Sequence, residues 1–274
     1  MIYAVVNRKG GTGKTTTTVN VAARIAQLRP TERVLIIDLD PQGHTAVALG
    51  VQGNGRCVGD FLADRKAFRD VVVSGSNAHM KRPNLFVIPA TNRLQDTLAE
   101  LNLTLGMQYF THGDRYHGPL MANILAYRLN DWLGHFRYVF LDCPPSLGLL
   151  SNAVYDLADR VIVPVRMAYL DTAGAGQNIE DIYYAQDSGA EIRITAVVPT
   201  FYRPRERVTQ FMLQQIQDSY PRSVISEPIP QSTVIEQSQA SGQQTIFEFA
   251  PDSPPALAYD NLVERILHDD EVVA

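Results

Sequence analysis

A glycine-rich segment at residues 7–16 constrains the fold more than any other part of the chain. It reads Asn-Arg-Lys-Gly-Gly-Thr-Gly-Lys-Thr-Thr, and it lies between a short apolar run, Ile2–Val6, and a helical pattern, Lys14–Leu28. In a strand-loop-helix unit of this kind, glycines let backbone amides turn inward and hold phosphate oxygens. The helix N-terminus adds the positive end of its dipole. The segment therefore predicts a site for nucleotide phosphates.

The residues of this loop have separate expected roles. Lys14 is placed to reach the β- and γ-phosphates, and the Thr15 hydroxyl to bind Mg²⁺. Pro199, which follows a later apolar run, is expected near the adenine pocket. The other predicted cofactor-binding residues are Lys9, Gly10, Gly11, Thr12, Gly13 and Thr16. The expected cofactors are ATP and Mg²⁺.

Lys9 stands just before the glycines, where the minimal phosphate-loop pattern requires no lysine. A lysine at the start of the loop can hardly curl back onto its own phosphates. It is better placed to cross a dimer interface and meet the nucleotide of a partner subunit, as an arginine finger does in trans. The alternative interpretation is a solvated surface lysine.

Three aspartates follow two further apolar runs. Asp38 and Asp40 come after Val34–Ile37, and acids at i and i+2 of a strand end face the same side. Beside a phosphate loop they suit metal–water contacts and positioning of the attacking water. The alternative for Asp40 is a surface turn, since Asp-Pro-Gln-Gly is good turn chemistry. Asp142 follows Tyr138–Leu141, where a second Mg²⁺ anchor is expected. The predicted metal ligands are thus Thr15, Asp38 and Asp142, and the predicted catalytic residues are Lys9, Lys14 and Asp40.

Short β-branched runs alternate with longer helical patterns along the chain. The predicted strands are Ile2–Val6, Val34–Ile37, Leu85–Ile88, Tyr138–Leu141, Val161–Val165, Ile194–Val198 and Val224–Ile229. The predicted helices are Lys14–Leu28, Leu94–Leu103, Leu120–Phe136, Thr172–Gln186, Arg205–Ser219 and Ala256–Leu267. The alternation predicts an α/β fold of the P-loop NTPase kind, a doubly wound, mostly parallel β-sheet with helices on both faces. Ligands gather at the carboxyl ends of such strands, so Gly10, Asp38, Asp142 and Pro199 are expected to converge.

Composition sets the remaining expectations. No shift in composition divides the 274 residues, so one domain spanning 1–274 is expected, with a frayed tail at 269–274 and a loop at Gly106–Gly118. Two cysteines, no visible signal peptide and no long apolar run favour a cytoplasmic protein. With a net charge of −5, any DNA binding must use a local basic patch.

Three motifs together resemble the ParA/Soj partition ATPases, which belong to the ParA/MinD family of deviant Walker P-loop ATPases. They lie at 9–16, 38–43 and 141–150, and Pro-Pro-Ser-Leu-Gly in the third is closer to ParA/Soj than to MinD. The resemblance implies an ATP-sandwich homodimer that binds DNA non-specifically and associates with the nucleoid. It also implies a ParB-like or cargo-adaptor protein that stimulates ATP hydrolysis, so that a plasmid, a chromosome or a protein organelle is positioned. By resemblance Lys9 is the signature lysine, Lys14 and Thr15 are the phosphate and Mg²⁺ ligands, and Asp40 is needed for hydrolysis.

The DNA contact departs from the pattern of many relatives, which carry an arginine where this chain has Gln231. We therefore expect the contact at Arg203, Arg205 and Arg207, three arginines within five residues. Solvation of these arginines, or a role near the adenine pocket, stays open. The alternative function is a MinD-like ATPase at a membrane surface. Acids in the 269–274 tail would repel anionic lipid, so no membrane partner is expected.

Overall fold

One seven-stranded sheet forms the centre of the molecule. The computed structural model describes residues 1–168, 172–241 and 243–273. The strands are β1 (Ile2–Val5), β2 (Val34–Asp38), β3 (Val73–Ser74), β4 (Leu85–Ile88), β5 (Tyr138–Asp142), β6 (Arg160–Arg166) and β7 (Arg193–Thr200). Their order is β3-β4-β2-β5-β1-β6-β7, and every pair is parallel except β3 with β4. The predicted, mostly parallel sheet is confirmed.

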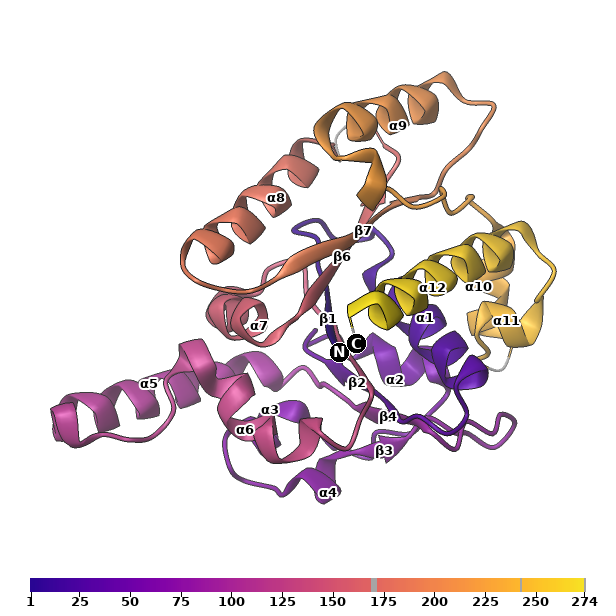
Figure 1. Ribbon diagram of the computed structural model, residues 1–274. Helices are drawn as coiled ribbons and strands as arrows, with labels where there is room; N and C mark the ends of the chain where they lie inside the picture. The colour runs from indigo at the N-terminus through magenta and orange to yellow at the C-terminus, as the bar shows by residue number, and fades with distance from the viewer. Residues whose placement is uncertain (169–171, 242, 274) are drawn as a thin grey trace.

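Helices cover both faces of this sheet (Figure 1). They are α1 (Lys14–Leu28), α2 (His44–Leu49), α3 (Val58–Leu62), α4 (Phe68–Val71), α5 (Leu94–His112), α6 (Ile124–Leu133), α7 (Ser151–Leu157), α8 (Thr172–Asp187), α9 (Arg207–Ser219), α10 (Thr233–Ala240), α11 (Ile246–Phe249) and α12 (Pro254–Val273). Alternate residues of β1 belong to two separate cores. Tyr3 and Val5 share a core with α1, α11 and α12, whereas Ala4 and Val6 share one with α3 to α9. The doubly wound arrangement follows from this alternation.

The predicted strand Val224–Ile229 is wrong. The chain forms a 3₁₀ turn at Arg222–Val224 and then runs beside β7 without forming a strand. It makes an isolated bridge at Ile225, and the Ser226 and Ile229 amides donate to carbonyls of β7. Pro228 and Pro230 supply no backbone N–H, so this stretch cannot complete a ladder.

Two predictions of irregular structure are also wrong. The expected loop Gly106–Gly118 is helical as far as His112, because α5 continues through Gly106 among good helix formers. The expected frayed tail continues α12 as far as Val273. Asp270 is buried there and accepts a hydrogen bond from the Tyr3 hydroxyl, so a tertiary contact holds the tail in place. Within the described residues, every helix is too short or too polar to cross a membrane.

Candidate active site

The phosphate loop joins β1 to α1 and has the backbone that its glycines predict. Gly11 and Gly13 have φ angles of +71° and +91°, a region that favours glycine. Gly13 is also the N-cap of α1, and its carbonyl accepts the helical bond from the Thr17 amide. The loop therefore turns directly into a helix N-terminus, the arrangement that binds anions.

Two side chains hold the loop in position. Asn7, just after β1, donates from Nδ2 to the Pro164 carbonyl at 2.7 Å and accepts from the Lys9 amide at 2.8 Å. Thr200, at the end of β7, donates from Oγ1 to the Thr12 carbonyl at 2.9 Å. The loop is thus fixed to β6 and β7, which flank it on one side.

Lys14 places a cation inside the loop. Its Nζ donates to the carbonyls of Asn7 and Lys9, at 3.1 and 2.9 Å. Burial lowers the pKa of Lys14, an effect that the negative charges of Asp142 and Asp40 partly oppose. The ammonium therefore lies within the hollow of the loop, bonded to groups that phosphate oxygens can replace. Lys9 itself is half-buried at the start of the loop.

Asp38 and Asp142 lie side by side at the carboxyl edge of the sheet, as direct neighbours in the β2–β5 register. Both are buried. Asp38 accepts hydrogen bonds from the amides of Asp40 and Thr45, and Asp142 accepts one from the Thr45 hydroxyl at 2.7 Å. The hydroxyls of Thr15 and Thr18 also bond to Asp142.

This cluster fits a hard cation. Burial raises the pKa of Asp38 well above its ordinary value, and the charge of Asp142 adds to the shift. Burial likewise raises the pKa of Asp142. A carboxyl with a raised pKa costs stability as pH rises through that pKa, and a nearby cation removes the cost. Carboxylate and hydroxyl oxygens are also the donors that Mg²⁺ prefers.

Asp40 is half-buried and lines a cavity of about 870 Å³. The walls also include the phosphate loop and the segment 144–150 after β5. Its Oδ1 accepts from the Gln42 amide at 2.9 Å, and its carbonyl accepts from the Gly43 amide. The predicted turn is therefore present, and it holds one acid at the mouth of the phosphate cavity.

A smaller cavity of about 130 Å³ lies on the other side of Gly13 and Thr16. Its further lining residues are Thr200, Phe201, Ile229, Pro230, Gln231, Ser232, Ile235, Glu236, Gln239 and Tyr259. Pro199, predicted here, is not among them. It is buried in β7, where its carbonyl accepts from the Ile229 amide, and the next two residues line the cavity instead. The adenine role expected for Pro199 stays a prediction, and Thr200 and Phe201 are the residues at the end of β7 that line this cavity.

Several residues at the site were not predicted from the sequence. Thr45 bonds to both metal-site aspartates from the start of α2. Arg166 lies with its guanidinium 4.8 Å from the centre of the Phe201 ring, and a Cβ built on Gly11 would be 3.9 Å from its Nη1. Thr45 comes two residues after the Asp-Pro-Gln-Gly turn, and this short distance could have indicated that it lies near the aspartates. The residues around Arg166 form no motif that indicates a position at the site.

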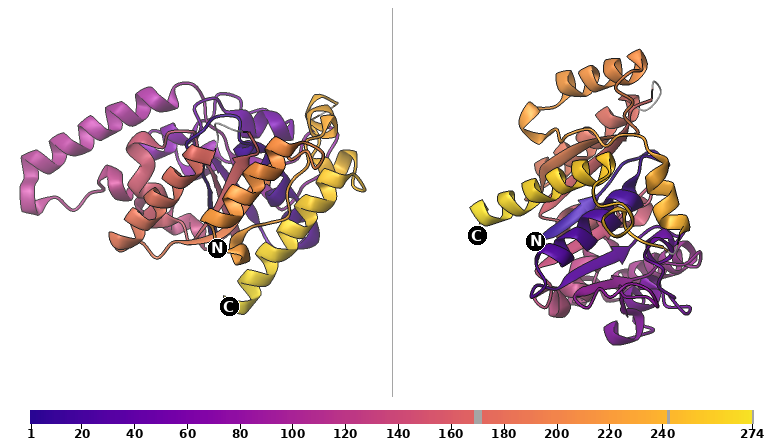
Figure 2. Two further views of the ribbon diagram at one scale, coloured as in Figure 1. Left: turned by 90° about the horizontal axis from the view of Figure 1, so that it is seen from above. Right: turned by 90° about the vertical axis from the view of Figure 1, so that its right-hand side faces the viewer.

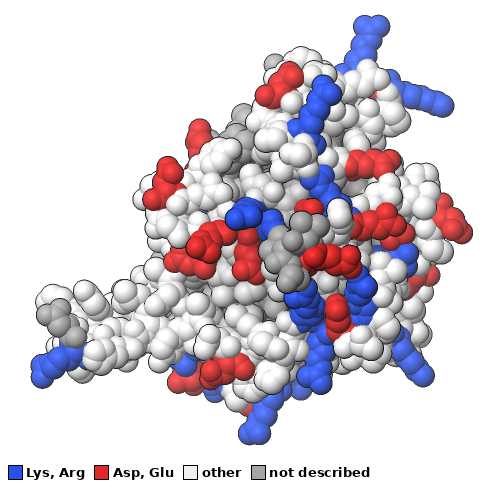
Figure 3. Space-filling view, viewed as in Figure 1, with Lys and Arg blue, Asp and Glu red and all other residues white. Residues whose placement is uncertain are grey.

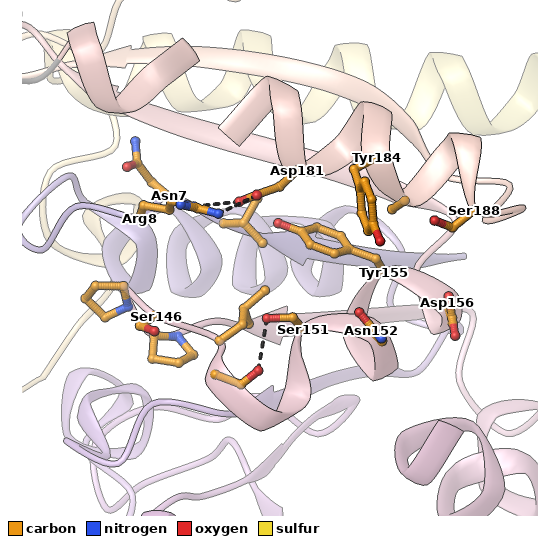
Figure 4. A pocket seen from close by; sticks show the side chains of 16 residues that line it. Asn7, Arg8, Ser146, Ser151, Asn152, Tyr155, Asp156, Asp181, Tyr184 and Ser188 are labelled. Carbon is orange, nitrogen blue, oxygen red and sulfur yellow. Dashed lines mark hydrogen bonds and ion pairs between the residues drawn. The ribbon is translucent and has the colours of Figure 1, made fainter. Parts of the chain in front are cut away.

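A third cavity, of about 750 Å³, opens beside the phosphate loop between α7 and α8 (Figure 4). Arg8 makes a two-pronged ion pair across it with Asp181 of α8, with Nε to Oδ2 at 2.6 Å. Tyr155 of α7 lies beside this pair, and Tyr184 of α8 stands farther along the cavity. Residues 144–148 line both this cavity and the phosphate cavity, so the two cavities share a wall.

The three arginines predicted to contact DNA lie in and just after the turn that precedes α9. Arg203, Arg205 and Arg207 are all exposed. Arg203 forms an ion pair with Glu206 at 2.6 Å, which offsets part of its charge. Basic side chains project from the corner of the surface that α9 occupies (Figure 3). Gln231, by contrast, lines the small cavity beside Gly13.

Comparisons with known proteins agree with this geometry. A family model described as "AAA domain" matches residues 1–194. The sporulation initiation inhibitor protein Soj of Bacillus subtilis (strain 168) is 29% identical over 268 residues, covering 97% of each chain. Apo McdA of Cyanothece superposes with a TM-score of 0.80 at 21% identity, covering 97% of this chain and 98% of that one.

A third similar protein was solved with ligands. Cobyrinic acid a,c-diamide synthase of Mycobacterium smegmatis, with bound ADP and magnesium, gives a TM-score of 0.75 at 26% identity, covering 100% of this chain and 96% of that one. Because the family match spans more than half of the 274 residues, the protein belongs to this AAA-domain family, as a P-loop ATPase of the ParA/MinD type.

Proposed function

We propose that the protein is a positioning ATPase that binds ATP with Mg²⁺, dimerises around the nucleotide and hydrolyses it when a partner protein stimulates the reaction. The observation that carries this proposal is the pair of buried carboxylates, Asp38 and Asp142, packed with threonine hydroxyls against a loop that encloses Lys14. Relatives named for chromosome partitioning support the positioning role.

Each residue of the cluster has a task in this proposal. The nitrogen of Lys14 exchanges its two carbonyl partners for phosphate oxygens, helped by the amides of the loop. Thr15, Asp38 and Asp142 would hold the metal ion through their hydroxyl and carboxylate oxygens. When bound, Mg²⁺ supplies positive charge for the phosphates during transfer. The cavity beside Gly13 holds the adenine, where Gln231 offers donors and acceptors to the base.

Asp40 is the residue that we assign to the attacking water. It lines the phosphate cavity without being buried among the metal-site oxygens, so one of its oxygens can face water while Oδ1 holds the Gln42 amide. An ionised carboxylate in this place orients the water and accepts its proton.

Lys9 is expected to act on the nucleotide of a partner subunit. We predict that Lys9→Ala binds ATP with near wild-type affinity as a monomer and forms no ATP dimer. The backbone carbonyl that Lys14 uses is retained in this variant, so the loop keeps its shape. Titration calorimetry and sedimentation velocity check the two halves of the prediction. Lys81→Ala, at an exposed lysine away from the cavities, is the control. Normal ATP-dependent dimerisation of Lys9→Ala would contradict the role in trans and favour the interpretation of Lys9 as a solvated surface lysine.

We propose that the ATP dimer binds DNA non-specifically through Arg203, Arg205 and Arg207, at the N-terminal end of α9, which brings it to the nucleoid. Dimerisation doubles a small patch, which explains how an acidic chain would bind DNA only with ATP. The triple change Arg203→Ala, Arg205→Ala and Arg207→Ala, in a hydrolysis-defective background, should leave the dimer intact and weaken DNA binding. Each lost phosphate contact should also lower the slope of log affinity against log salt by about 0.9.

Filter binding across a salt series measures both effects. The control is Arg65→Ala with Arg69→Ala, a second exposed basic pair that lies just after α3 and in α4. If affinity and slope keep their parent values in the triple variant and fall in the control, DNA binds at Arg65 and Arg69 instead.

A further inference from the structure

The outer half of α5 projects from the body as an arm. We define the α5 arm as residues 101–112. Figure 1 and the view from above in Figure 2 both show it extending past the neighbouring helices. The base of the same helix lines the phosphate cavity through Gln95, Leu98 and Ala99. The helix therefore begins at the nucleotide and ends in solvent.

One side of the arm is an exposed apolar stripe. Leu103, Met107 and Phe110 are 68%, 71% and 90% exposed. At 100° per residue, Ala99 and these three residues lie within about 80° of one another around the helix axis. The buried positions of α5, which include Leu101 and Leu105, lie on the opposite side. The stripe is thus the direct continuation of the helix face that lines the phosphate cavity.

The arm carries no charge to keep it solvated. Residues 101–111 contain no Lys, Arg, Asp or Glu. Figure 3 shows most of the arm as uncharged surface, with basic atoms at its tip. Exposed helix faces are ordinarily polar or charged, and apolar faces of this kind mark interaction sites. DNA and anionic lipid both require basic side chains, so neither fits the stripe.

The returning chain makes the arm an ordered element. The Tyr116 hydroxyl donates to Gln108 Oε1 at 3.3 Å and to the Pro119 carbonyl at 2.9 Å. The rings of Tyr109 and Tyr116 meet edge to face, with centroids 6.2 Å apart. These contacts lie along the side of the arm from which the chain returns, and the stripe stays exposed.

We propose that a second copy of this chain covers the stripe when two subunits close around ATP. The inference rests on the proposed function, since it adds a contact to that dimer. Ala99 forms part of the wall of the phosphate cavity that such a subunit would cover, and Leu103 is one turn farther along the same helix face. In a two-fold dimer both arms engage, so each side chain of the stripe contributes twice.

The length of the arm fits a partner of this size. The helix rises about 16 Å from Ala99 to Phe110. A compact chain of this length has a radius of gyration of about 19 Å. A copy centred over the cavity would therefore extend beside the whole arm. We infer that the stripe increases the stability of the ATP dimer and leaves nucleotide binding by the monomer unchanged.

The test replaces the stripe by a polar helix former, with Leu103→Gln, Met107→Gln and Phe110→Gln combined in the Asp40→Ala background. Sedimentation velocity with Mg²⁺ and ATP should show at least a roughly tenfold rise in the dimer dissociation constant. Calorimetry should show unchanged ATP affinity, which also verifies folding. The control replaces three exposed apolar residues elsewhere, Val208→Gln, Phe211→Gln and Leu257→Gln, and should dimerise like the parent.

A second readout places a single thiol at the tip, with Phe110→Cys. Cys57 and Cys143 are buried, and burial raises the pKa of the Cys143 thiol, so maleimide should react with the new thiol alone. Labelling should slow at least about fivefold with ATP and stay fast with ADP.

The outcomes separate the two proposals. If the parent dimerises with ATP and the stripe variant does so equally well, the inference about the stripe is wrong, and the proposed ATP dimer is unaffected. If the stripe variant dimerises normally, and the same three changes in the wild-type background abolish stimulation by the partner protein, the stripe is the contact for that partner and the inference is again wrong. If the parent itself stays monomeric with ATP, the proposed function fails, and the inference fails with it.

Discussion

Replacing Lys14 with alanine is expected to weaken ATP binding at least about 100-fold. The ammonium lies within the phosphate loop, where it makes two hydrogen bonds to carbonyls that phosphate oxygens would replace. Hydrogen bonds to charged groups contribute about 1.5–3 kcal/mol each, so two of them correspond to a loss of this size. Isothermal titration calorimetry of the monomer measures it directly.

The same substitution should leave stability nearly unchanged. Burial lowers the pKa of Lys14, so below that pKa the folded protein bears the cost of a buried charge. Alanine removes this cost together with the two carbonyl bonds, and the effects offset each other. A melting temperature close to the wild-type value, with ATP affinity lost, supports the assignment. Unchanged ATP affinity would show that the nucleotide does not use this loop.

Asp40→Ala is expected to keep ATP affinity and to reduce turnover at least about 100-fold, the lower end of what a positioned acid or base contributes. The Asp40 side chain lines the phosphate cavity and is only half-buried, whereas the metal-site pair is buried, so its removal should leave binding intact. Steady-state phosphate release with the partner protein present measures turnover.

A conservative variant separates catalysis from turn structure. Asp40 Oδ1 accepts the Gln42 amide, and asparagine keeps this acceptor while removing the negative charge. Asp40→Asn should therefore be as slow as Asp40→Ala. If asparagine restores turnover, the residue serves the turn alone, and a wild-type rate in the alanine variant would exclude Asp40 from the reaction.

The parts of the fold predicted from sequence are those in which local pattern and tertiary structure agree. Runs such as Val34–Ile37 and Tyr138–Leu141 are buried on both faces of a parallel sheet, and such strands are continuously apolar. The phosphate loop was predictable because its backbone needs positive φ angles at Gly11 and Gly13, and glycine is the residue that adopts them readily. Asp38 and Asp142 followed from the same reasoning, since both stand at strand ends.

The parts that were missed depend on contacts between distant segments. Arg8 pairs with Asp181 across 173 positions, and no local spacing indicates that bond. Asp270 is buried through Tyr3, so an acidic tail that reads as frayed is held in a helix. Pro199 was predicted from its place after the run Ile194–Val198, but β7 continues as far as Thr200. Pro199 is therefore buried within the strand, and Thr200 and Phe201 line the small cavity.

The central claim is that ATP, and not ADP, brings two copies of this chain together. The most direct measurement is sedimentation velocity of Asp40→Ala with Mg²⁺ and either nucleotide. The account predicts a dimer with ATP, which this variant cannot hydrolyse, and a monomer with ADP. The same sedimentation coefficient with both nucleotides would contradict it.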